Sequence, residues 1–122
     1  MTTDPQDLVR QLWQCIWIDG ELEGLDDLIA DPFVRHTNDG TSSMSRTAYK
    51  DHIADVITTF KGNEITFDHL ASSGDHVFAR LTLTGVNIAA GNTVKITWLA
   101  HYRIRDTRIA ESWSLHENDL DW

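Results

Sequence analysis

The hydrophobic pattern of this chain changes once, from a helical spacing to a strand spacing. In the first half, apolar residues recur every three or four positions, as on one face of a helix. From Glu64 onward, apolar and polar residues alternate, as in strands with one buried face. Helices followed by a run of strands predict an α+β fold rather than alternating βαβ units.

Three helices are predicted before the strands. The first begins at Asp4-Pro5, a capping acid followed by proline, and ends at Asp19-Gly20. A short second helix, from Leu22 to Ile29, ends at Asp31-Pro32, and an extended piece at 33–36 leads into a polar loop at 37–43. Ser45 caps a third helix, which closes at 61–63.

About four long antiparallel strands are predicted in the second half. Their apolar and polar positions alternate within 64–69, 77–83, 94–104 and 109–117, and 72–75 has the composition of a turn. We expect one curved sheet whose concave face is covered by the helices. Such a sheet encloses a hollow between its strands and the helices.

The last two strands carry unusual side chains for a plain core. Trp98 and Tyr102 share one face, and Trp113 shares its parity with Glu111 and Glu117. Aromatic rings beside carboxylates are typical of a pocket wall. On the opposite face, His101 lies with Leu99 and Arg103, and this half-apolar outer face predicts contacts between two copies of the chain in a homodimer.

Bulk composition limits the possible partners. The 122 residues predict a single domain, 1–122, and ten basic against nineteen acidic side chains give a net charge of −9. That charge disfavours nucleic acid and anionic membranes. One cysteine, no apolar run of membrane-spanning length and no signal-like start favour the cytoplasm.

Three segments carry a resemblance to a known superfamily. They are Leu25-x-x-Leu28-Ile29-Ala30-Asp31-x-Phe33-Val34, Gly74-Asp75-x-Val77-x-Ala79-Arg80 and Tyr102-Arg103-Ile104-x-Asp106-x-Arg108-Ile109-x-Glu111-x-Trp113. In order and position they resemble the nuclear transport factor 2-like superfamily, most closely its SnoaL-like polyketide cyclase branch. The resemblance implies a cone-shaped, cystatin-like α+β fold, with three N-terminal helices packed on a strongly curved antiparallel sheet.

The resemblance also implies a pair of catalytic residues. An acid four residues after the hairpin tryptophan acts in proton transfer in that branch, and here this position is Glu117. A polar residue commonly follows the hook, and here it is His36. The oxyanion-donor acid of the related ketosteroid isomerases falls near Ala100, which cannot donate. The final turn, 106–108, lacks the family's usual glycine. The alternative is that His36 caps a loop and Glu117 is a solvated strand-end acid.

The aromatic side chains are candidates for binding a flat hydrophobic ligand or for core packing, and the helical spacing of Trp13, Trp17 and Tyr49 favours the core. His52 flanks the apolar line of the third helix and could also point inward. The predicted substrate-binding residues are Trp13, Trp17, Phe33, Tyr49, Trp98, Tyr102 and Trp113.

These features predict a SnoaL-like enzyme that cyclises or isomerises a small hydrophobic, carbonyl-bearing molecule by acid/base chemistry. We expect no metal and no organic cofactor, because the histidines lack the paired spacing of a zinc motif and no phosphate-binding loop is present. One alternative is a non-catalytic binding domain. Another is a dimerisation module in which the tryptophans fill the hollow.

Overall fold

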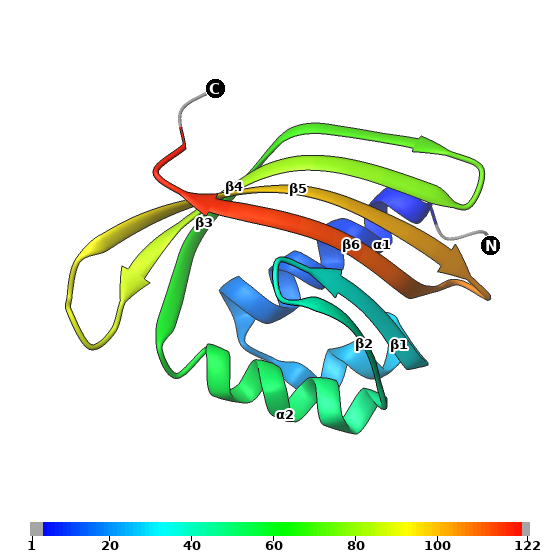
Figure 1. Ribbon diagram of the computed structural model, residues 1–122, viewed down its shortest axis with the longest axis horizontal. Coiled ribbons are helices and arrows are strands. Elements are labelled where there is room, and N and C mark those ends of the chain that lie inside the picture. The colour runs from blue at the N-terminus through cyan, green and yellow to red at the C-terminus, as the bar shows by residue number, and fades with distance from the viewer. Residues whose placement is uncertain (1–3, 121–122) are drawn as a thin grey trace.

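Six strands form one curved sheet, and all the helices lie on one side of it (Figure 1). This computed structural model describes residues 4–120. The strands are β1 (Ile29–Thr37), β2 (Gly40–Met44), β3 (Phe60–Ser73), β4 (His76–Asn87), β5 (Thr93–Arg105) and β6 (Arg108–Asn118). Their order across the sheet is β2-β1-β6-β5-β4-β3. Neighbouring strands are antiparallel except β1 and β6, which are parallel, so the sheet is mixed.

The helices start and stop where the sequence provides caps. Helix α1 (Pro5–Trp13) begins with the Asp4 carboxylate accepting from the amide of Gln6, and it continues as the π-helix η1 (Gln14–Asp19). Gly20 ends this helix with φ 65°, a conformation that glycine adopts at little cost. A 3₁₀ helix, η2 (Leu22–Asp27), follows, and Ser45 caps α2 (Arg46–Val56). Within residues 4–120, no helix has the length and apolar character needed to cross a membrane.

Several predicted boundaries were wrong. Strand β1 begins at Ile29 and so replaces the end of the second helix, and the expected polar loop contains β2. Helix α2 ends at Val56, and β3 already starts at Phe60. The three helices therefore do not all precede the strands, and only two of the helical segments are long. The edge strand β2 escaped prediction because it is largely exposed and pairs through its backbone, so it needs no alternation of apolar residues.

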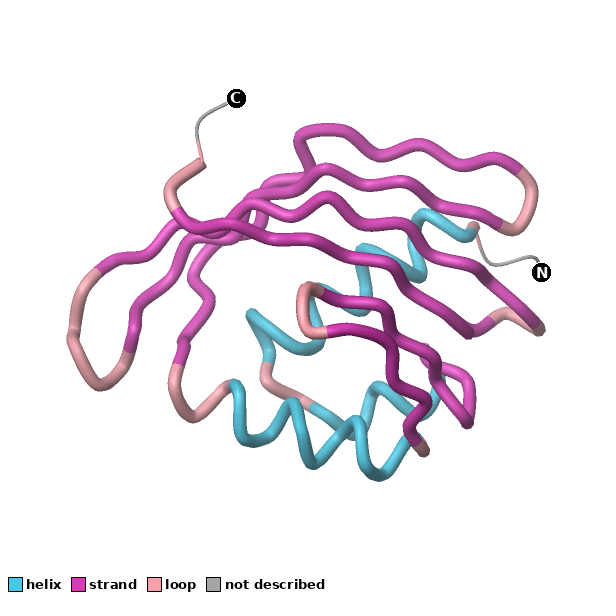
Figure 2. Tube along the Cα trace, in the orientation of Figure 1, coloured by secondary structure: helices cyan, strands magenta, loops and turns pink. Residues whose placement is uncertain are grey.

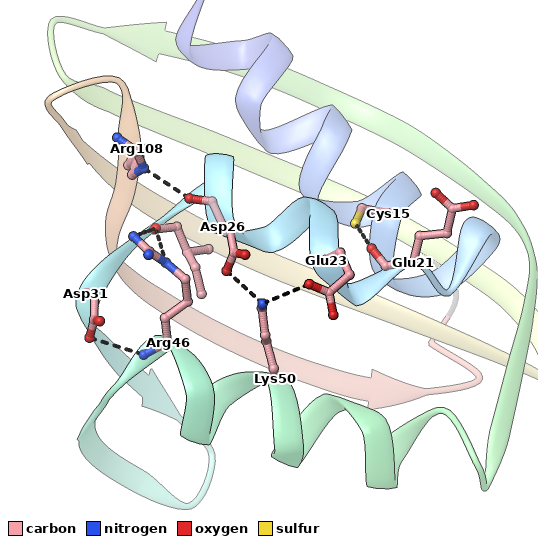
Figure 3. A network of polar contacts seen from close by, with 9 residues as sticks. Cys15, Glu21, Glu23, Asp26, Asp31, Arg46, Lys50 and Arg108 are labelled. Atoms are coloured by element: carbon pink, nitrogen blue, oxygen red, sulfur yellow. Dashed lines mark hydrogen bonds and ion pairs between the residues drawn. The ribbon is translucent and has the colours of Figure 1, made fainter.

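A network of polar contacts fixes α2 beneath the sheet (Figure 3). Lys50 Nζ lies 2.7 Å from a carboxylate oxygen of Asp26 in η2, and the Arg46 guanidinium donates to the carbonyl oxygen of Ile29 at 3.1 and 3.0 Å. Arg108 donates to the backbone carbonyl of Asp26. These contacts join α2 to η2 and β1, and they direct the buried side chains of Tyr49 and Ile53 toward the sheet.

The sheet has an inner face, toward the helices, and an outer face (Figure 2). On β5 the inner face carries Trp98, Ala100 and Tyr102, all buried, and the outer face carries the alternate residues. A bulge in β6 changes which residues reach each face. Arg103 pairs with Glu111 and Ile104 with Ile109, so Ala110 has no partner opposite it.

Candidate functional site

A cavity of about 570 Å³ lies between the inner face, α1, η1 and α2. We call it the inner cavity. Its volume falls within the range of about 300–1,000 Å³ typical of small-molecule sites. This open cavity argues against the alternative in which the tryptophans fill the hollow. Six of the seven predicted binding residues line the inner cavity: Trp13, Trp17, Phe33, Tyr49, Trp98 and Tyr102.

The indole of Trp13 holds one end of the aromatic wall in place. Its Nε1–H donates to the Tyr102 hydroxyl at 2.8 Å, a buried hydrogen bond between α1 and β5. The Trp13 ring meets Trp98 edge-on, with 4.9 Å between centroids. Trp17 lies 6.2 Å from both of these rings. The result is a rigid apolar surface suited to stacking on a planar ligand.

Two tyrosines in the wall remain neutral phenols. Burial raises the pKa of Tyr102 and also that of Tyr49. Tyr49 packs edge-on against Phe33, with 5.0 Å between centroids. These phenols can donate or accept hydrogen bonds, but neither supplies a negative charge at neutral pH.

Three basic side chains interrupt the apolar wall. Arg35 comes from β1, His52 from α2 and His116 from β6. Partial burial lowers the pKa of His52, and the positive charge of Arg35 lowers it further. The His116 ring lies 5.2 Å from that of Trp98. An imidazole with a lowered pKa is neutral at pH 7 and can accept a proton.

The predicted pair, His36 and Glu117, does not face the inner cavity. His36 lies on the outer face, where its Nε2–H donates to Glu111 at 2.6 Å and its ring stacks on Trp113 at 5.0 Å. Glu117 is an exposed side chain near the end of β6, in register with Thr97 of β5. The expectation that both groups look into one cavity is therefore wrong.

Strand parity explains this result. On β1, Phe33 and Arg35 point inward, so the intervening positions point outward. On β6, the bulge places Ile109 inside but Glu111 and Trp113 outside. A strict alternation counted from Ile109 therefore predicts Trp113 on the inner face, whereas the bulge places it on the outer face.

The outer face forms its own polar and aromatic cluster. Glu111 accepts from His36 and from Arg103 Nε, at 3.1 Å, and these contacts hold the pKa of its carboxyl below the ordinary value. The rings of His36, Trp113, His101 and Phe78 lie in sequence, with centroids 5.0, 4.6 and 4.4 Å apart. A shallow groove of about 480 Å³ lies beside them.

The positions of the three basic side chains in the cavity wall are only weakly indicated by the sequence pattern. Arg35 shares its parity with the buried Phe33, and His116 shares its parity with Ser112 and Ser114. His52 is adjacent to the buried Ile53 and does line the cavity, as the pattern allowed. In residues 4–120, no three His, Cys, Asp or Glu side chains gather in a way that could hold a metal ion.

Known proteins share this architecture. A family model for the SnoaL-like polyketide cyclases matches residues 7–118. IdmH from Streptomyces antibioticus, a proposed polyketide cyclase, is 22% identical with a TM-score of 0.79, over 96% of this chain and 93% of that one. A proposed polyketide cyclase from Acidithiobacillus ferrooxidans is 16% identical with a TM-score of 0.81, over 96% of this chain and 90% of that one.

A third similar structure is an LEH-like epoxide hydrolase from M. tuberculosis. It is 12% identical with a TM-score of 0.76, over 93% of this chain and 82% of that one. At these identities the three structures establish a shared fold. No curated protein matches the sequence at a significant level.

Proposed function

Because this chain belongs to the SnoaL-like polyketide cyclase family, we propose that its inner cavity catalyses acid/base chemistry without a cofactor. The reaction is the cyclisation or isomerisation of a hydrophobic, carbonyl-bearing molecule. The similar structures described as polyketide cyclases support this class of reaction. The observation that carries the proposal is the position of an imidazole, that of His52, in the lining of a largely apolar cavity.

His52 is the proposed base. Its neutral imidazole removes a proton from the carbon next to a carbonyl, and the C–H electron pair moves to form an enolate. In a cyclisation, the enolate carbon then attacks a second carbonyl of the same molecule, and the new alkoxide takes up a proton. In an isomerisation, the proton returns from the imidazolium to a different carbon. Both routes need a neutral imidazole within hydrogen-bonding reach of the acidic C–H group.

Hydrogen exchange at an acidic carbon tests this role without the natural substrate. The probe is methyl 1-tetralone-2-carboxylate in deuterated buffer, followed by proton NMR. Wild-type protein is expected to accelerate exchange at C2, and His52→Gln to lower the catalysed rate by about 100-fold, the lower range for general base catalysis. His69→Gln, on β3 beside the outer groove, is the matched control and should exchange at the wild-type rate.

The pH dependence gives a second check. The catalysed rate should rise with pH through an inflection below 6.5, because the His52 pKa is lowered and only the neutral ring accepts a proton. Equal rates in wild type and His52→Gln would contradict the assignment of the base. Binding of the probe without any catalysed exchange would instead support a non-catalytic binding domain.

We also propose that two copies of the chain pair through the outer face. Three large apolar side chains there are unusually exposed: Phe78 at 44%, Leu99 at 48% and Leu115 at 60%. They surround the groove beside Trp113 and His101. A second copy would cover this apolar area while leaving the inner cavity free.

A further inference from the structure

Arg35 places a permanent positive charge in the wall of an apolar cavity. Strand β1 directs the side chain inward between Phe33 and Thr37, which also line the cavity. The guanidinium carbon lies 5.1 Å from the centroid of the Tyr49 ring, so the charge sits over an aromatic face. This contact leaves the edge of the guanidinium, with its N–H donors, available to another group.

Arg35 has no acidic partner among residues 4–120. Arg10 pairs with Asp7 and Arg103 with Glu111, whereas Arg80 and Arg105 also form no ion pair in this range but are exposed to water. Asp39, an acidic residue in the cavity lining, belongs to the exposed turn after β1 and forms no ion pair within the same described range. A half-buried charge without a counter-charge is costly. An anionic ligand would supply the missing partner.

The other ionisable groups around the cavity do not supply that charge. Tyr49 and Tyr102 stay protonated, because burial raises the pKa of each. His52 feels the positive field, since Arg35 contributes to the lowering of its pKa. His116 can only be neutral or positive. The cavity wall around Arg35 is therefore positive although the whole chain carries a net charge of −9.

We infer that the inner cavity selects hydrophobic ring compounds that bear a carboxylate, with the carboxylate paired to Arg35 and the rings packed against Trp13 and Trp98. A guanidinium matches a carboxylate through two parallel hydrogen bonds, which fixes the orientation of the ligand as well as its affinity. The substrate of the proposed reaction is then a carboxylic acid rather than an ester or a neutral ketone. This inference rests on the proposed function only in assigning a substrate class to the same cavity.

Binding of 2-naphthoate and its neutral analogue 2-naphthamide tests the inference. The two probes have the same ring system and differ in charge. Trp13, Trp17 and Trp98 line the cavity, so quenching of tryptophan fluorescence reports occupancy. The proteins compared are wild type, Arg35→Met, Arg35→Lys and the control Arg105→Met, which removes an exposed arginine at the end of β5. Circular dichroism confirms that each variant is folded.

Wild type should bind the naphthoate at least about tenfold more tightly than the amide, which corresponds to about 1.4 kcal/mol. Arg35→Met should abolish this preference while it leaves amide binding within about twofold. Arg35→Lys should restore part of the preference, because it keeps the charge but loses the planar fork. Arg105→Met should behave like wild type.

Three results would overturn the inference. They are equal affinity of wild type for both probes, a preference that survives in Arg35→Met, and an equal loss of affinity for both probes in Arg35→Met. The last would mean that Arg35 only supports the wall. The exchange assay uses a neutral ester and reports on His52, so exchange can succeed where charge selection fails. Absence of binding by either probe, together with absence of exchange, would refute both proposals.

Discussion

Replacing Glu111 with glutamine should destabilise the fold without touching the inner cavity. Glu111 lies on the outer face, where its two carboxylate oxygens accept from His36 at 2.6 Å and from Arg103 at 3.1 Å. Glutamine is nearly isosteric, but it offers one acceptor oxygen in place of two and carries no charge. The substitution therefore leaves Arg103 without its counter-charge.

The structure sets the size of the effect. A hydrogen bond to a charged group contributes about 1.5–3 kcal/mol when well buried, and exposed ion pairs contribute less than about 1 kcal/mol. The Glu111 side chain is 19% exposed and that of Arg103 33%, between these limits. Loss of the charged pair should lower the free energy of unfolding by about 1–2 kcal/mol at pH 7.

The effect should depend on pH in a defined direction. The pKa of Glu111 is below its ordinary value of 4.5 in the folded protein, chiefly because of the bond from His36 and then that from Arg103. The unfolded chain therefore binds the proton more readily, and the stabilisation is fully present above pH 4.5. It is lost as the pH falls through the lower, folded-state pKa. The difference between wild type and Glu111→Gln should shrink accordingly.

Urea unfolding followed by circular dichroism, repeated from pH 7 down to the lowest pH at which wild type is folded, measures this difference. Glu117→Gln is the matched control, because Glu117 is an exposed acid on the same strand and should lose no measurable stability. Equal stability of Glu111→Gln and wild type at pH 7 would refute the reasoning. So would a difference that stays constant below pH 4.5, or an equal loss in Glu117→Gln.

Two further predictions concern the cavity wall and the outer face. Tyr102→Phe removes the acceptor of the buried Trp13 indole N–H, and it should lower the free energy of unfolding by about 1–2 kcal/mol. An unchanged midpoint of urea unfolding would contradict a structural role for that hydrogen bond. Leu115→Arg should convert a dimeric wild type to a monomer in analytical ultracentrifugation, because it places a charge in the proposed interface. Ile88→Arg, an equally drastic change at the turn after β4, should leave the dimer intact, and a monomeric wild type would refute the interface.

Local chemistry made much of the fold predictable. Asp4-Pro5 and Ser45 start helices because their side chains satisfy free backbone amides, and Gly20 ends one because it tolerates a positive φ. The period-two alternation of the last four strands predicts the curved sheet, because one face must be buried. The same alternation places Trp98 and Tyr102 together on one face of the sheet, and both line the inner cavity.

The site itself depended on features that no local pattern encodes. The bulge at Ala110 reverses the facing of β6, so Trp113 and Glu111 lie outside although Ile109 lies inside. The parallel pairing of β1 with β6 brings His36 beside Trp113 across a large separation in sequence, and this joins it to Glu111 rather than to the cavity. Arg35 and His52 share one cavity only because β1 and α2 both flank it in the folded chain.

The sequence by itself therefore determined most of the element types, most of their caps and the aromatic character of the cavity, because each depends on neighbours a few residues away. Tertiary structure alone decided which polar side chains share that cavity. A single inserted residue in one strand changes the face on which every later side chain lies, and the choice of partner for another strand decides which side chains become its neighbours. Neither is set by hydrophobic periodicity.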